Sequence, residues 1–149
     1  AQTHRENAKK FEAQGRFQEA LDELAGALGL AMDDKEADEV RNSIFQMVRR
    51  MPQPPEMSED ARKYGLRGEI LIKEGEREGA ISEFKKAIRL APFSARLYFN
   101  AALIYGEVKN YSEAIRYMRI YLQAAPDAPN ARAVEYEIIK WELLMERGE

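Results

Sequence analysis

The sequence predicts an all-α fold built as a row of antiparallel helix pairs, and three observations carry this prediction. First, when Ala20, Ala80 and Ala114 are superposed, the residues around them fall into register. Second, this register places repeat starts at residues 61, 95 and 129, at a constant interval of 34 residues. Third, Pro92 and Pro126 stand at matching places where a second helix must end, because proline cannot continue a helix.

Small and large residues alternate as closely packed helix pairs require. Two antiparallel helices approach closely only where one of them presents glycine or alanine. The small residues at these places are Ala8, Gly68 and Ala102 on first helices and Ala20, Ala80 and Ala114 on second helices. The large residues that fill the space between layers are Phe11, Leu71 and Tyr105 on first helices and Leu24, Phe84 and Met118 on second helices.

This pattern resembles the tetratricopeptide repeat, a helix-turn-helix unit known from many bacterial proteins. The unit that starts at residue 61 supplies the expected residues Tyr64, Gly68, Leu71, Ala80, Phe84, Ala87 and Pro92. The unit that starts at residue 95 departs from the family pattern clearly at only one place, where Tyr121 replaces an alanine. The first unit is degenerate, with His4 in the place of a bulky residue and Met32 in the place of the proline. The resemblance implies a right-handed superhelical solenoid.

The period divides residues 1–149, taken as one tetratricopeptide domain, into repeats and irregular segments. Residues 1–34 are the degenerate unit, and residues 61–94 and 95–128 are the two regular units. Each repeat contacts only its neighbours in such an array, so we expect a row of small interfaces instead of one central core.

Residues 35–60 fall outside the period and interrupt the row. Val40, Ile44 and Met47 recur at helical spacing and predict one extra amphipathic helix. The following stretch, MPQPPEMSED, predicts an extended linker, because its three prolines favour polyproline geometry.

Residues 129–149 predict a single long helix that caps the array. Val134, Ile138 and Trp141 form an apolar stripe that Ala131 and Met145 extend at both ends. The last interface of a solenoid must be covered by an element that is polar on its outside, so we expect a polar outer face here.

Composition excludes several classes of function. The 23 Lys and Arg against 26 Asp and Glu give a net charge of −3, which leaves no positive field for nucleic acid or for an anionic membrane surface. Cysteine is absent and one histidine is present, which excludes disulfides and cysteine-ligated metal. No run approaches the roughly 18 apolar residues of a membrane-spanning helix. We therefore expect a binding module that inserts in no membrane.

No catalytic, metal or cofactor site is expected. His4 lies in what should be a frayed first turn, without a second histidine or a cysteine to form a dyad. The acidic run from Asp33 to Glu39 lacks the central glycine of a calcium loop and is better read as a charged helix start. Gly75 and Gly79 flank the turn between helices, where compact backbone is needed, and do not form a phosphate loop.

The resemblance implies a concave surface, lined by first helices, that contacts a partner. The candidate residues on it are Arg62, Glu69, Arg96, Phe99, Asn100, Leu103, Asn130 and Glu137. Phe99 and Leu103 lie one turn apart, and Gly65 and Ala133 leave room on both sides. We expect a shallow apolar pocket centred on Phe99 that accepts a bulky apolar anchor of a peptide. The alternative is that residues 35–60 or a second copy of the chain cover Phe99.

The carboxylate clamp, by which some members of the family grip the C-terminus of a chaperone, is not expected. The clamp needs lysine, arginine and asparagine at five places, and this chain has Gly65, Glu69, Asn100, Asn130 and Val134 there. Only Asn100 fits, so a chaperone tail is not the predicted partner.

Two function classes follow. The first is a module that binds a peptide or protein segment in its concave groove without catalysis. The alternative is a homo-oligomeric scaffold that associates through the same surface or through residues 35–60. An exported or periplasmic location is expected from the Ala-Gln start and from the likeness of PDAPNARAVEYEIIKWE to the closing segment of exported bacterial repeat proteins. A cytoplasmic location and an arbitrary first residue stay open as alternatives.

Overall fold

The computed structural model describes residues 2–148, so the expectations that rest on Ala1 and Glu149 lie outside the described residues. Eight α-helices and no strands occur in this range, which confirms the all-α fold. The chain divides into two compact units, one formed by Ala1–Ser58 with Arg89–Phe93 and the other by Glu59–Ile88 with Ser94–Glu149. The assignment of residues 1–149 to one domain stays a prediction.

The first unit contains the helices α1 (Gln2–Ala13), α2 (Phe17–Gly29) and α3 (Asp34–Arg50). Helix α2 packs against both α1 and α3. The side chain of Asp33 caps α3 by accepting a hydrogen bond of 2.8 Å from the N–H of Glu36, so the acidic run is a helix start, as predicted. Residues 51–58, which contain the three prolines, form no helix.

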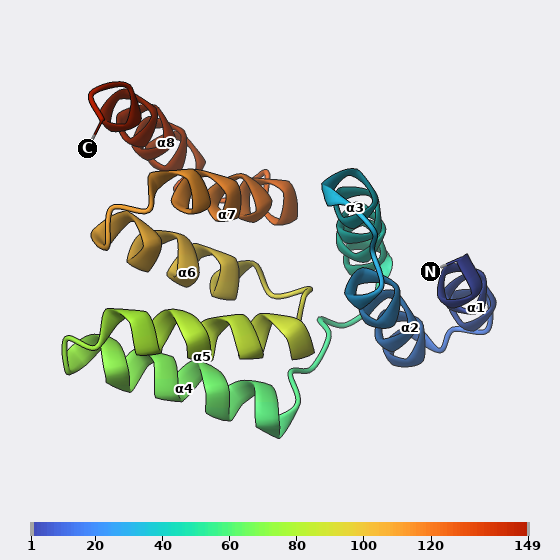
Figure 1. The fold of residues 1–149 in the computed structure, drawn as a ribbon. Helices are drawn as coiled ribbons and strands as arrows, with labels where there is room; N and C mark the ends of the chain where they lie inside the picture. The colour runs from blue at the N-terminus through green and yellow to red at the C-terminus, as the bar shows by residue number, and fades with distance from the viewer. Residues whose placement is uncertain (1, 149) are drawn as a thin grey trace. The chain divides into compact units, whose positions relative to one another are not determined.

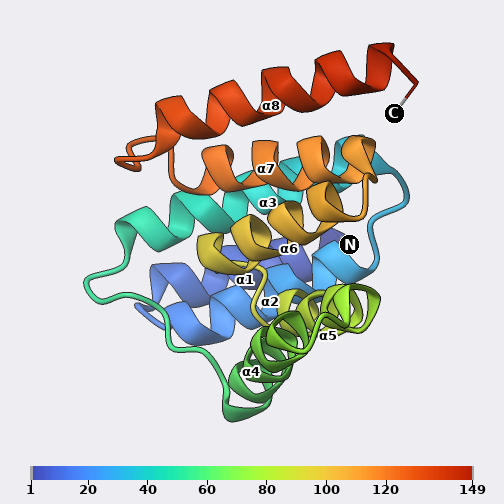
Figure 2. The same ribbon diagram turned by 90° about the vertical axis from the view of Figure 1, so that its left-hand side faces the viewer.

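The second unit contains α4 (Glu59–Lys73), α5 (Arg77–Leu90), α6 (Ala95–Glu107), α7 (Tyr111–Ala124) and α8 (Ala131–Glu146), with the last two residues of α5 counted in the first unit. Helices α4 and α5 form one antiparallel pair and α6 and α7 the next (Figure 1). Helix α8 lies along α7 in both views (Figures 1 and 2).

The first helices α1, α4 and α6 all end in the same turn, a Schellman motif. The residues with left-handed backbone in this turn are Gly15, Gly75 and Lys109, with φ of 74°, 79° and 64°. The bonds that close it, from N–H to carbonyl, are Arg16 to Phe11 at 2.9 Å, Glu76 to Leu71 at 2.8 Å and Asn110 to Tyr105 at 2.9 Å. The third turn is therefore built like the others but without glycine.

Two glycines allow large rings to approach a helix closely. A Cβ atom on Gly68 would lie 2.9 Å from the ring of Phe84, which explains the small residue predicted on α4. A Cβ atom on Gly106 would lie 2.7 Å from the ring of Trp141, so α8 packs on α6 through a buried indole. The stripe of Val134, Ile138 and Trp141 is buried, as the sequence predicts.

Three expectations about local structure are wrong. Gly79 lies inside α5 and not in the turn, and it leaves room for Leu71, whose side chain would be 3.3 Å from a Cβ atom on this glycine. Met145 is exposed and does not extend the buried stripe. The outer face of α8 is not polar, because Tyr136 is 73% exposed there and is accompanied by further exposed apolar residues.

No helix within residues 2–148 has the length and apolar character needed to span a bilayer.

Candidate functional site

The predicted surface on the second unit is held together by an ion pair between its first helices. Arg96 of α6 donates a hydrogen bond of 2.9 Å to Glu69 of α4. Both side chains reach solvent, so the pair ties neighbouring repeats with an energy of about 0–1 kcal/mol. Arg62, on the same helix as Glu69, is exposed.

Phe99 is half-buried, and its ring contacts a tyrosine that the sequence did not single out as a site residue. The ring centroids of Phe99 and Tyr121 lie 5.0 Å apart at an interplanar angle of 54°. The hydroxyl of Tyr121 donates a hydrogen bond of 2.7 Å to the side-chain oxygen of Asn130. Tyr121 therefore links two predicted site residues. The signal for it in the sequence is its departure from the family pattern, which has alanine at this place.

The other predicted site residues differ in how far their side chains are exposed to solvent. Leu103 is 38% exposed, Asn100 is half-buried, and Glu137 is paired with Lys140 of the same helix at 3.6 Å. Val134 and Gly106, which occupy groove places in the family pattern, are taken up by packing, Val134 in the buried face of α8 and Gly106 beneath the ring of Trp141.

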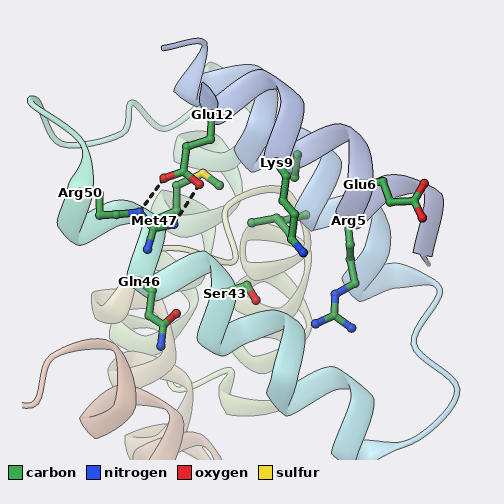
Figure 3. Close-up of a pocket in the computed structure, with 10 residues that line it drawn as sticks. Arg5, Glu6, Lys9, Glu12, Ser43, Gln46, Met47 and Arg50 are labelled. Carbon is green, nitrogen blue, oxygen red and sulfur yellow. Dashed lines mark hydrogen bonds and ion pairs between the residues drawn. The ribbon is translucent and has the colours of Figure 1, made fainter. Parts of the chain in front are cut away.

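A hollow that the sequence did not predict lies between α1 and α3 of the first unit (Figure 3). It encloses about 360 Å³ and is lined by Arg5, Glu6, Ala8, Lys9, Glu12, Leu24, Ser43, Gln46, Met47 and Arg50. We call these ten residues the α1–α3 groove. Ala8, Leu24 and Met47 are buried and make its floor apolar, whereas the side chains around its rim are polar or charged.

The charges of the α1–α3 groove are unevenly compensated. Glu12 accepts two hydrogen bonds from Arg50, of 2.6 Å and 2.9 Å, so this acid and base neutralise each other. Arg5 is 4.0 Å from Glu39, at the limit of an ion pair. Lys9 makes no hydrogen bond or ion pair within residues 2–148. In Figure 3 Lys9 and Arg5 point from α1 toward α3, whereas Glu6 points away.

The residues that α1 contributes to the α1–α3 groove could have been predicted from the sequence. Arg5, Glu6, Lys9 and Glu12 stand in the first unit at places equivalent to the site positions of the later units, but the degenerate pattern of this unit gave no reason to extend the site to it. The contribution of Ser43, Gln46 and Met47 was harder to foresee, because α3 falls outside the period.

His4 has a structural role. Its Nδ1 atom lies 2.5 Å from a carboxylate oxygen of Glu23, and its ring fills the space above Gly26, where a Cβ atom would lie 3.0 Å away. The expectation that His4 belongs to a frayed turn is wrong, because these contacts tie α1 to α2. Among residues 2–148 no three histidine or acidic side chains come close enough together to hold a metal ion.

Antiparallel helix pairs whose first helices end in the same turn define a helical-repeat protein. The family model of the tetratricopeptide repeat matches residues 61–94 and 95–127. These two units are tetratricopeptide repeats, and the resemblance predicted from the sequence is confirmed. Repeats of this family generally bind other proteins, which supports a protein-interaction or scaffold role for this chain.

Two crystal structures of MamA are similar to the chain, each at 17% sequence identity. One has a TM-score of 0.47 and the match covers 94% of this chain and 86% of that chain. The other has a TM-score of 0.45, with 95% of both chains covered. No curated protein matches the sequence.

Proposed function

We propose that the protein binds a segment of another protein along the concave sides of its first helices and catalyses no reaction. The observation that carries the proposal is the α1–α3 groove, a hollow of about 360 Å³ at the places where this class of repeat contacts its ligands. A cavity of this volume accommodates a few side chains of a peptide.

The charges of the groove favour a ligand with an acidic side chain. A carboxylate beside Lys9 gains a charge-assisted hydrogen bond, and Lys9 gives up no existing partner for it. Arg5 offers a second donor from the same helix, one turn away. Ser43 and Gln46 of α3 supply polar groups on the opposite wall, and Met47 on the floor accepts an apolar atom.

The predicted residues of the second unit are proposed as a second contact surface for the same class of ligand. Phe99 and Leu103 supply apolar area, and Arg62, Glu69, Arg96, Asn100, Asn130 and Glu137 supply a polar rim. The contact of Phe99 with Tyr121 supports a rigid anchor site, because an aromatic ring held by a second ring loses little conformational entropy on binding.

The test starts from peptides selected from a displayed random library against the full chain. We expect acidic residues to be enriched, and we expect the substitution Lys9→Glu to weaken binding of a selected synthetic peptide at least tenfold. Lys10→Glu is the matched control, since it makes the same charge change on the next residue of α1, outside the groove.

Equal losses for Lys9→Glu and Lys10→Glu would show that only net charge matters and would remove the groove from the proposal. Phe99→Ala, measured with the same peptides, reports on the second surface. The homo-oligomeric alternative is tested by light scattering over a range of concentrations, because only self-association raises the mass as concentration increases.

A further inference from the structure

The outer face of α8 carries an apolar stripe that the described chain leaves uncovered. Tyr136, Ile139 and Leu143 follow one another at spacings of three and four residues, so they share one face of the helix. Ile139 and Leu143 are each 54% exposed. The opposite face, with Val134, Ile138 and Trp141, is buried. Helix α8 is therefore apolar on two sides, which is unusual for an end helix that needs contact on only one.

The repeat register identifies what normally covers this face. With the interval of 34 residues, Tyr136 corresponds to Ala102 and to Gly68, and Ile139 corresponds to Tyr105. Two of these earlier residues face the second helix of their own pair: Gly68 lies against Phe84 of α5, and Tyr105 stacks on Tyr117 of α7 at 5.3 Å. The exposed stripe of α8 is thus the face on which a first helix receives its second helix.

Helix α8 does not turn at the register position where the earlier first helices end. Leu143 corresponds to Gly75 and Lys109, the left-handed residues at which the earlier first helices end. Leu143 instead lies inside α8, which continues to Glu146. The left-handed backbone comes instead at Gly148, five residues after the place that Gly75 and Lys109 hold in the repeat.

A shallow hollow marks the stripe. It encloses about 300 Å³ and is lined by Tyr136, Ile139, Lys140, Leu143, Leu144 and Arg147. Arg132 also lies at helical spacing from Tyr136 on this face and is exposed. Arg132, Lys140 and Arg147 are interspersed with the apolar stripe, and Lys140 is paired with Glu137 of the same helix at 3.6 Å. The acidic residues Glu135, Glu142 and Glu146 lie along one edge.

We propose that this face of α8 binds an amphipathic helix of another protein, with a leucine-type apolar seam flanked by acidic residues. The seam would pack on Tyr136, Ile139 and Leu143 as a second helix packs on a first, and the acidic residues would lie beside Arg132, Lys140 and Arg147. This surface lies on the second unit and is separate from the α1–α3 groove, so the two proposals stand or fall independently.

A second copy of the chain fits this surface poorly. An isologous pairing of two α8 helices about the middle of the stripe would place the Lys140 side chains of both copies side by side. Helix α4 of a second copy fits no better. Its exposed apolar pair, Leu66 and Ile70, lies among Arg62, Lys63 and Arg67, so docking it on α8 would also bring positive charge against positive charge. Charge complementarity selects an acidic partner.

The experiment uses the full chain and two synthetic helical peptides with the same leucine seam, one flanked by glutamate and the other by lysine. We expect the glutamate peptide to bind at least tenfold more tightly, by fluorescence anisotropy. The double substitution Tyr136→Ser with Leu143→Ser should weaken its binding at least tenfold. The matched control, Leu66→Ser with Ile70→Ser on α4, removes a similar exposed apolar pair and should change nothing.

A charge reversal makes the test sharper. In the variant Lys140→Glu with Arg147→Glu the preference should move from the glutamate peptide to the lysine peptide. Circular dichroism of each variant checks that the fold is kept, which we expect because all six substituted side chains lie on the exposed surface. Equal binding of the two peptides to the unaltered chain, or no binding of either, would overturn the proposal. A second result would also overturn it: a molar mass by light scattering that rises with concentration for the unaltered chain but stays at that of the monomer for the Tyr136→Ser, Leu143→Ser variant. That result would identify a second copy of the chain as the occupant.

Discussion

Helices α6 and α8 occupy the same place in consecutive repeats, yet only α6 is covered on both sides. Ala102 of α6 is fully buried, whereas the corresponding Tyr136 of α8 is exposed. Likewise Tyr105 is 7% exposed and its counterpart Ile139 is mostly exposed. A first helix in this fold therefore has two separate apolar faces, one for its pair and one for its neighbour in the row.

The face toward the neighbouring repeat anchors α8 through Trp141, and removal of this side chain should have the largest effect on stability. Trp141→Ala empties the space over Gly106, so we expect a loss of about 3–5 kcal/mol in the free energy of unfolding, measured with urea. Tyr136→Ala on the outer face is the control, with an expected change within about 0.5 kcal/mol. Similar losses for both variants would mean that the two faces of α8 are not distinct.

The pair face of α6 should make stability depend on pH. Burial first, and then the neighbouring Tyr117, raises the pKa of Tyr105 from 10.0 to about 12. Because the neutral phenol is favoured in the folded state, its contribution is complete below pH 10 and is lost as pH rises toward 12.

The loss amounts to at most about 3 kcal/mol, since one pKa unit corresponds to about 1.4 kcal/mol. Urea unfolding at several pH values should show this decline in the unaltered chain and a smaller one in Tyr105→Phe. An unchanged decline in Tyr105→Phe would assign the effect to other tyrosines.

The close approach of α6 and α8 should tolerate no added carbon atom. Gly106→Ala places a Cβ atom 2.7 Å from the indole of Trp141, so we expect a loss of about 1–3 kcal/mol by urea unfolding. In the double variant Gly106→Ala with Trp141→Ala this cost should largely disappear, because the clashing ring is gone. If the losses in the free energy of unfolding of the two single variants simply add in the double variant, the strain arises elsewhere.

The turn after α6 should be improved by glycine. Lys109 holds a left-handed backbone that costs a residue with a side chain about 1 kcal/mol, and Gly15 and Gly75 avoid this cost in the other turns. Lys109→Gly should therefore raise the free energy of unfolding by about 1 kcal/mol. Gly75→Lys, the reverse exchange in the preceding turn, should lower it by a similar amount.

Much of the fold could be predicted from the sequence, because repeated spacing of Ala20, Ala80 and Ala114 reports directly on helix packing. The repeat also located the turns, although Lys109 in a left-handed backbone could not be foreseen from a residue type that rarely adopts it. The extra helix after residue 34 was predicted from its apolar spacing alone.

The candidate site was harder to predict than the fold. The contact between Phe99 and Tyr121 depends on a residue that breaks the family pattern, and the α1–α3 groove needs a helix outside the period. The outer face of α8 was expected to be polar because a cap is normally solvated. Tyr136 and Leu143 break that rule, and a sequence pattern alone does not tell which of two apolar faces is buried.

Mapping where an acidic helix binds shows whether α8 is a first helix with an open pair face. Titration of the isotope-labelled full chain with the glutamate-flanked peptide, followed by amide NMR shifts, gives this map. We predict the largest shifts at Arg132, Tyr136, Ile139, Lys140 and Leu143. Shifts confined to α4 or to the α1–α3 groove, with α8 unchanged, would contradict the account.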